Sequence, residues 1–207
     1  MLIKYLGHAC FLIGDETKKI VIDPFGDIGY KQECVTADYC FCSHSHYDHH
    51  STDCVTVREI FDENCEASFD WVKTINSFHD EVCGQKRGKN NIYVFNFDKV
   101  TVCHMGDLGV PFSKELVEQI GKIDVLLIPI GGNYTIDSLN AKKYVEAIAP
   151  AIVIPMHYKT KRSDIDIDGK ELFIKHFNCI AKQRQFEIKK SDLTDAVVVY
   201  DIDDSDF

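Results

Sequence analysis

Four histidines and one aspartate lie within seven positions of the sequence, inside the stretch CFCSHSHYDHHS at 40–51. His44 and His46 are two residues apart, so on an extended backbone their side chains point the same way and can bind one ion. After the chain turns, Asp48 and His49 can face a second ion nearby. Imidazole and carboxylate ligands together suit zinc, and also manganese, iron or cobalt. The loop therefore predicts ligands for two divalent metal ions, each site being completed from elsewhere in the chain.

Three further candidate ligands follow segments that read as strands. His79 comes after TINSF, Asp107 after VTVCHMG, and His157 after IVIPM. Each lies at the carboxyl end of an apolar run, where α/β proteins tend to place functional groups. Gly106 directly precedes Asp107 and would let the backbone approach a metal closely. A carboxylate such as that of Asp107 can bridge two cations and lower their mutual repulsion.

The elements that must position these residues read as strands first and as alternating strands and helices later. Apolar and β-branched runs predict strands over 2–6, 8–13, 19–23, 38–43, 71–77, 91–96, 99–103, 123–130, 151–156 and 195–200. Helices are predicted over 53–62, from Ser113 to about Gly121, from Asp137 or Ser138 to near Ala149, and over 169–182. This order predicts a layered α/β fold. No repeat or linker interrupts it, so we expect one domain over residues 1–207.

Composition and charge exclude several classes of protein. The chain has 207 residues, of which 45% are hydrophobic and 27% charged, as in an ordinary globular protein. No apolar run approaches a membrane span, and the N-terminus does not read as a signal peptide, so we expect a cytoplasmic protein without membrane contact. The formal net charge of -10 argues against nonspecific binding to nucleic acid.

The nine cysteines are predicted to be reduced. Their number is odd, and they show neither a CxxC pair nor the spacing of a small disulfide-rich domain. Most lie among apolar neighbours, where cysteine packs as a small hydrophobe; examples are Cys10, Cys40, Cys42 and Cys103. We therefore expect core thiols in a reducing compartment. For Cys40 and Cys42, just before the first histidine, a ligand role is the alternative to core packing.

The motifs carry a resemblance to a known family. HSHYDH matches the HxHxDH signature of the metallo-β-lactamase superfamily. The wider pattern resembles its L-ascorbate-6-phosphate-lactonase-like and N-acyl-phosphatidylethanolamine phospholipase D-like branch, because YLGHACFLI, IDP, HxHxDH, a later histidine, GD, PIGG and PMHY occur in that order over 5–158. The resemblance implies an αββα sandwich, in which two β-sheets lie face to face with helices outside, and a dinuclear site at one edge.

The resemblance also implies a division of the ligands. One metal would be bound by His44, His46 and His79, and the other by Asp48, His49 and His157, with Asp107 bridging the two. Asp23 matches an early aspartate that orients the site, which makes physical sense because ligand histidines need a partner on their other nitrogen. His8 could reach the site or serve as a hydrogen-bonding core residue. His104 could line the pocket as a proton donor or support a ligand, and His50 is expected to point away.

This ligand set predicts metal-assisted hydrolysis of an ester, lactone or phosphodiester bond. Two cations about 3.5–4 Å apart lower the pKa of a shared water toward about 7, which gives a nucleophile at neutral pH. Asp107 would hold the bridge, Asp48 would accept the proton of the water, and His104 is a candidate to protonate the leaving group. The alternatives are a di-iron redox protein, a non-catalytic metal-binding module and a nuclease of the same superfamily.

Basic residues near the expected ligands predict an anionic small-molecule substrate. They are Lys86 and Arg87 beyond His79, and Lys159, Lys161 and Arg162 beyond His157. Solvated side chains around tight turns are the alternative explanation. Related proteins often self-associate, and the sequence leaves open whether this chain forms a homo-oligomer.

Overall fold

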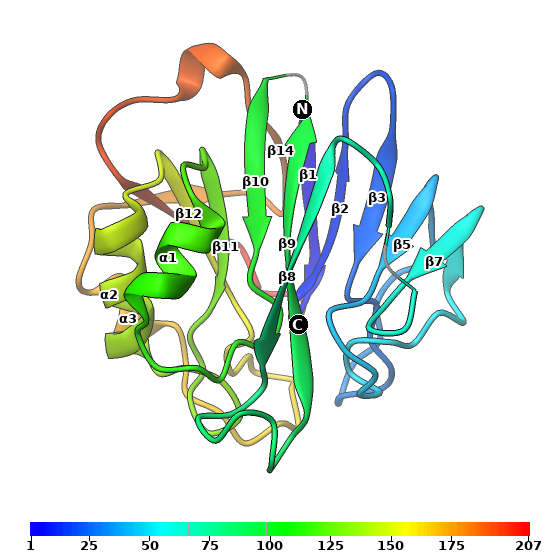
Figure 1. Ribbon diagram of the computed structural model, residues 1–207, viewed down its shortest axis with the longest axis horizontal. Coiled ribbons are helices and arrows are strands. Elements are labelled where there is room, and N and C mark those ends of the chain that lie inside the picture. The colour runs from blue at the N-terminus through cyan, green and yellow to red at the C-terminus, as the bar shows by residue number, and fades with distance from the viewer. Residues whose placement is uncertain (66, 98) are drawn as a thin grey trace.

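Two β-sheets lie face to face in the computed structural model, which describes residues 1–65, 67–97 and 99–207 (Figure 1). The six-stranded sheet has the order β14 (Gln185–Glu187), β1 (Leu2–Gly7), β2 (Cys10–Gly14), β3 (Lys19–Ile22), β5 (Tyr39–Phe41), β7 (Glu59–Phe61). The seven-stranded sheet has the order β13 (Cys179–Lys182), β15 (Val198–Ile202), β12 (Ile152–Met156), β11 (Val125–Pro129), β10 (Val100–His104), β9 (Lys89–Phe97), β8 (Val72–Phe78). Strands β4 (Val35–Thr36) and β6 (Val55–Thr56) form a separate parallel pair.

Three α-helices lie beside the outer face of the seven-stranded sheet in Figure 1: α1 (Lys114–Ile120), α2 (Ser138–Ile148) and α3 (Glu171–Ile174). The first two begin where the sequence predicts. Ser113 caps α1 by accepting a hydrogen bond from the Leu116 backbone N–H, and Asp137 caps α2 in the same way. A 3₁₀ turn, η1 (Lys190–Asp192), precedes β15. Within the described residues, no helix has the length and apolar character needed to span a membrane.

Alternation along the strands of the seven-stranded sheet divides the core in two. In β9, the rings of Tyr93, Phe95 and Phe97 are buried between the two sheets. Ile92 and Val94, on the other face, pack in the cluster that contains the helices. Because both faces of the sheet are covered at its centre, the neighbouring strands β11 and β12 are buried at every residue and almost continuously apolar.

Two helix predictions are wrong. The segment over 53–62 forms β6 and β7, of which β6 pairs with β4 and β7 pairs with β5, both in parallel. The β-branched residues Val55 and Thr56 favour this extended structure. The helix expected over 169–182 is limited to α3, and its second half forms β13 against β15. In both places a strand from elsewhere in the chain supplies the partner, which local sequence does not reveal.

The prediction of nine reduced cysteines is also wrong at one pair. Cys34 and Cys54, which are 20 residues apart, form a disulfide with a Cα–Cα distance of 4.3 Å. Each lies directly before a strand of the β4–β6 pair, so the long-range strand pairing brings the two sulfurs together. The other seven cysteines are free, and Cys40 and Cys42 are buried in the core between the sheets. The disulfide closes a loop that contains the whole HxHxDH segment.

Candidate metal centre

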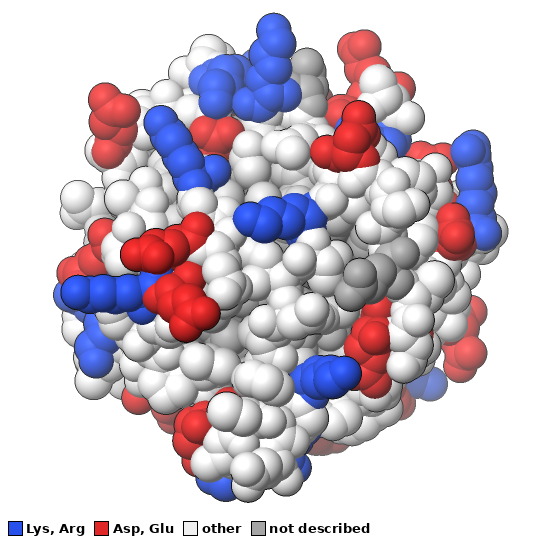
Figure 2. Space-filling view, in the orientation of Figure 1, with Lys and Arg blue, Asp and Glu red and all other residues white. Residues whose placement is uncertain are grey.

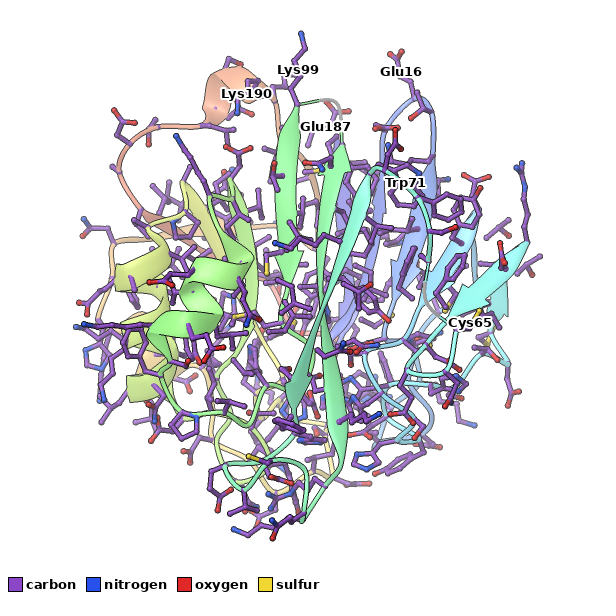
Figure 3. The ribbon with its side chains drawn as sticks, in the orientation of Figure 1. Glu16, Cys65, Trp71, Lys99, Glu187 and Lys190 are labelled. Carbon is purple, nitrogen blue, oxygen red and sulfur yellow. A yellow bond between two sulfur atoms is a disulfide. The ribbon has the colours of Figure 1, made fainter. Side chains whose placement is uncertain are left out.

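The candidate ligands meet at one edge of the sandwich. Each follows the end of a strand: His8 follows β1, Asp23 follows β3, His44 to His49 follow β5, His79 follows β8, Asp107 follows β10 and His157 follows β12. Figure 1 shows the loops of this edge at the bottom of the molecule. Figure 3 labels Glu16 and Lys99 at the opposite edge, where β2 joins β3 and β9 joins β10. Both sheets therefore contribute to the site.

Two groups of side chains are arranged as metal ligands. Ligand atoms of His44, His46 and His79 lie within 4.8 Å of one another, as the family resemblance implies for one metal. A second group with the same spacing contains the other three expected ligands together with one addition: Asp48, His49, His157 and His8. The structure thus brings together all seven residues expected to bind metal and adds His8 to the second position.

Asp107 lies where the two groups meet. Its Oδ2 is 3.1 Å from Nε2 of both His49 and His157, and 3.2 Å from Nε2 of His79. Its backbone N–H donates to Asn90 Oδ1 at 2.8 Å. The preceding Gly106 has a φ of +53°, and a Cβ there would lie 2.3 Å from Asn90 Oδ1. Only glycine therefore fits at 106, because the chain passes so close to Asn90.

Asp23 orients one histidine of each group. The buried carboxylate accepts a hydrogen bond from Nδ1 of His49 through Oδ2 at 2.9 Å. The Ser43 hydroxyl donates to the same Oδ2 at 2.7 Å, and its oxygen lies 2.9 Å from His44 Nδ1, from which it accepts. Both histidines thus carry their proton on Nδ1, which leaves Nε2 free to bind metal. This geometry matches the orienting role that the resemblance implies for Asp23.

His8 is the residue whose role the sequence left open. It is buried, and its Nε2 lies 3.4 Å from Asp48 Oδ2. The backbone of His8 is also hydrogen-bonded to a candidate ligand, because its carbonyl accepts from the His157 N–H at 2.9 Å. His8, Asp23 and His157 all have φ between 47° and 53°, a region that non-glycine residues seldom occupy. Such strain persists where the surrounding structure fixes the backbone and is concentrated at functional sites.

The charges of the cluster fit a divalent cation. Although burial opposes ionisation, the imidazoles of His157, His49 and His79 hold the pKa of Asp107 well below its usual range. Burial lowers the pKa of His44, and burial with the nearby His157 lowers that of His8 to about 4, so both imidazoles are neutral at pH 7. Among the described residues, Nε2 of His8, His44 and His49 and Oδ1 of Asp107 are buried without a hydrogen-bond partner. Metal coordination would satisfy these atoms.

The structure does not place His104 where a proton donor to substrate would have to be. Its side chain is fully buried, Nε2 donates to the carbonyl of Ala9 at 2.9 Å, and Nδ1 accepts from the Gly106 N–H at 3.1 Å. Both ring nitrogens are therefore used, and the supporting role is the one that the geometry fits. His50 points away from the cluster, as expected, and its Nε2 lies 3.3 Å from Asp62.

A cavity of about 680 Å³ opens above the cluster. Its lining includes five candidate ligands (His46, Asp48, His79, Asp107 and His157) and eight other residues (Asp27, Ile28, Tyr47, Arg87, Tyr134, Asp164, Ile165 and Asp166). The backbone around the cluster thus leaves the metal positions open to a small molecule from one side.

An anionic substrate was expected because of five basic residues in the sequence, and most of these residues do not line the cavity. Lys86 pairs with Glu81, Lys159 Nζ donates to the carbonyls of Ser163 and Ile165, and Arg162 donates to the carbonyl of Asp206. Figure 2 shows a group of basic side chains at the upper edge, where Figure 3 labels Lys99 and Lys190. Arg87 is the expected basic residue that does line the cavity.

Comparison with known proteins defines the class. A family model described as a beta-lactamase superfamily domain matches residues 2–157. A UPF0173 protein from Pyrococcus furiosus is 32% identical over 193 residues, covering 83% of this chain and 90% of that protein. A UPF0173 metal-dependent hydrolase from Thermococcus kodakarensis is 32% identical over 191 residues, covering 76% and 84%. The crystal structure of a proposed zinc-dependent hydrolase from Thermotoga maritima has a TM-score of 0.78 and 35% identity, covering 98% of this chain and 99% of that one.

The chain belongs to the metallo-β-lactamase superfamily. The predicted αββα sandwich is confirmed, with the described α-helices all beside the seven-stranded sheet. Within the superfamily, its relatives include proteins named UPF0173 metal-dependent hydrolases, which confirms the predicted class of enzyme at that level.

Proposed function

We propose that this protein is a metal-dependent hydrolase that holds two divalent ions, zinc in the first instance, side by side at the sheet edge. The observation that carries the proposal is the pair of ligand groups that meet at Asp107. Each group offers at least three nitrogen or oxygen ligands, and a carboxylate is shared between them. The Thermotoga maritima relative is described as zinc-dependent, and mixed imidazole and carboxylate ligands are typical of zinc.

Bound ions would supply an activated water and polarise the oxygen of the scissile bond. The residues of the chain would handle the proton transfer. Asp48 lines the cavity, and although burial opposes ionisation, the nearby His49 and His8 keep the pKa of its carboxyl below the usual range. An ionised Asp48 can accept a proton from the attacking water, and its Oδ2 lies 3.4 Å from Nε2 of His8.

The reaction that fits is hydrolysis of an ester, lactone or phosphodiester. One water is consumed, and its oxygen forms a bond to the carbonyl carbon or phosphorus. The bond to the leaving oxygen breaks, and the leaving alkoxide takes one proton of the water. No oxidant or reductant is needed, and each partner in the proton transfer is a residue or water in the cavity.

The test combines metal content with turnover. Elemental mass spectrometry on protein purified without added metal is expected to find two zinc ions per chain. The same sample is then assayed against phosphodiesters, lactones and thioesters, where hydrolysis of one class is expected. His46→Ala and Asp107→Asn should abolish it. His176→Ala changes an exposed histidine after α3 and serves as the matched control.

Three outcomes would contradict the proposal. A protein that takes up no metal on titration has no dinuclear site. Two irons with oxygen consumption would indicate redox chemistry in place of hydrolysis. Full activity of Asp107→Asn with both metals retained would show that the shared carboxylate is not needed.

A further inference from the structure

The wall of the cavity above the metal positions is acidic. Three carboxylates line it, those of Asp164, Asp166 and Asp27, of which Asp27 pairs with Lys31 at 3.6 Å, and one guanidinium, that of Arg87. This count leaves out the candidate ligands, whose charge the metals would balance. The floor of the same cavity contains Asp107, which is 1% exposed and has a buried Oδ1 without a hydrogen-bond partner among the described residues. The acidic wall therefore stands directly above the candidate metal positions.

The wall is built by two loops that hold each other in place. The Asp164 N–H donates to the carbonyl of Ile28 at 2.8 Å, which joins the loop of Asp27 to the segment 163–166. Lys159 Nζ donates to the carbonyls at both ends of Ser163–Ile165, at 2.6 and 2.8 Å. Asn133 Nδ2 donates to the Asp166 carbonyl at 2.8 Å. The backbone beneath the two carboxylates of this segment is thus fixed, while the carboxylates themselves are exposed.

Aromatic rings complete the lining. Tyr47 is 63% exposed and Tyr134 is 37% exposed, so both rings are accessible to a molecule in the cavity. The Arg87 guanidinium lies 5.3 Å from the centroid of the Tyr134 ring, so its charge already has a partner. Among the described residues, no lysine or arginine lies over the Tyr47 ring, which lines the same cavity as Asp164 and Asp166.

Carboxylates beside an open aromatic face are the groups that recognise an alkylammonium ion. We propose that the substrate is a small molecule with an alkylammonium group, which Asp164 and Asp166 hold against Tyr47 while the scissile bond lies over the metal positions. This inference rests on the proposed hydrolysis for the bond that is cleaved, and it replaces the anionic substrate expected from the sequence. It assigns substrate selection to the segment 163–166.

The first experiment compares choline with 3,3-dimethylbutan-1-ol, a neutral isostere in which carbon replaces the ammonium nitrogen. Calorimetric titration of the zinc-loaded full chain at low salt is expected to show choline binding about tenfold more tightly. The preference should shrink as ionic strength rises, because the two carboxylates are exposed. Equal affinities for the two compounds would overturn the inference.

Substitutions then test whether Asp164 and Asp166 cause the preference for choline over its neutral isostere. The double variant Asp164→Asn/Asp166→Asn keeps the shape of the wall and removes two charges, so choline should bind within about twofold of the isostere. The affinity of the isostere should not change. Asp195→Asn removes a charge from an exposed loop after η1 and is the matched control. If Asp195→Asn weakens choline binding as much as the double variant does, net charge explains the preference and the wall does not.

Turnover separates this inference from the proposed function. The probes are p-nitrophenylphosphorylcholine and the p-nitrophenyl 3,3-dimethylbutyl phosphodiester, assayed beside the wider panel. If no compound of the panel is hydrolysed but choline binds through Asp164 and Asp166, the hydrolase fails and the ammonium subsite stands. If the two probes are hydrolysed equally and choline shows no preference, the hydrolase stands and the ammonium subsite fails.

Discussion

At the scale of single residues, Asp23 orients one histidine of each candidate ligand group without lining the cavity. One of its oxygens accepts from His49 directly and from Ser43, which in turn accepts from His44. A single carboxylate oxygen therefore sets the tautomer of one histidine in each ligand group. Its pKa is lowered despite burial, because His49 and His104 lie close to it.

We predict that Asp23→Asn lowers the affinity for both metals together. An amide nitrogen cannot accept from His49 and Ser43, so the imidazoles lose the partner that keeps Nε2 free, and the affinity is expected to fall about 10–100-fold. Competition with a coloured chelator during zinc titration measures this. Asp38→Asn is the control, because the Asp38 carboxylate lies outside the site, where it accepts from the Lys19 backbone N–H and pairs with Arg58. Unchanged zinc affinity in a folded Asp23→Asn protein would show that the orientation does not matter.

The residues that the sequence predicted well are those that local pattern defines. The spacing of His44, His46, Asp48 and His49 indicates ligands because it places four donors on one turn after a strand. His104 could not be placed in this way, since its direction depends on the carbonyl of Ala9 in the other sheet. His8 remained open for the same reason, because Asp48 comes to it from 40 residues along the chain.

At the scale of elements, the loop after β8 connects the metal position to the cavity wall. Asp80 follows the candidate ligand His79, is 1% exposed, and accepts hydrogen bonds from four backbone N–H groups, those of Val82, Gly84, Lys86 and Arg87. Its carboxylate thereby shapes the turn that carries Arg87 to the cavity. Although burial opposes ionisation, these hydrogen bonds lower the pKa of Asp80 to about 2.

We predict that Asp80→Asn destabilises the protein in a pH-dependent manner. The folded pKa of Asp80 lies below the unfolded value of about 3.9, so the carboxylate stabilises the fold above about pH 4 and this contribution is lost as the pH falls toward 2. The free energy of unfolding in urea should be about 1–3 kcal/mol lower than for the wild type at pH 7. The difference should shrink between about pH 4 and pH 2. A difference that does not change with pH would contradict this account.

Asp62→Asn is the matched control for that prediction, since the Asp62 carboxylate likewise accepts hydrogen bonds from the backbone N–H groups of a turn, those of Asn64 and Cys65.

Some elements of the fold could be predicted from the sequence and others could not. The strands with apolar runs and the capped helices α1 and α2 were predictable from local residues. The strands β6, β7 and β13 were not, because each forms by pairing with a strand distant in the chain.

At the scale of the whole molecule, the candidate metal site draws its residues from both sheets. His8, His44, His46, Asp48 and His49 follow strands of the six-stranded sheet, whereas His79, Asp107 and His157 follow strands of the seven-stranded sheet. Removing the ions would leave buried carboxylates and imidazoles facing each other across the sandwich without a cation. Binding free energy at such a site contributes to the stability of the whole fold, since the ligands come together only in the folded chain.

We therefore predict that chelation lowers the unfolding temperature of the entire domain. Metal present at a thousandfold excess over its Kd stabilises the fold by about 4 kcal/mol, which for a chain of this size corresponds to roughly 8–16 °C. Scanning calorimetry with and without a chelator measures the shift, which readdition of zinc should reverse. His46→Ala removes an exposed ligand of one group only and should keep part of the shift, whereas Asp107→Asn, which affects both groups, should lose most of it. The same unfolding temperature with and without chelator would mean that the sheets are not held together by metal.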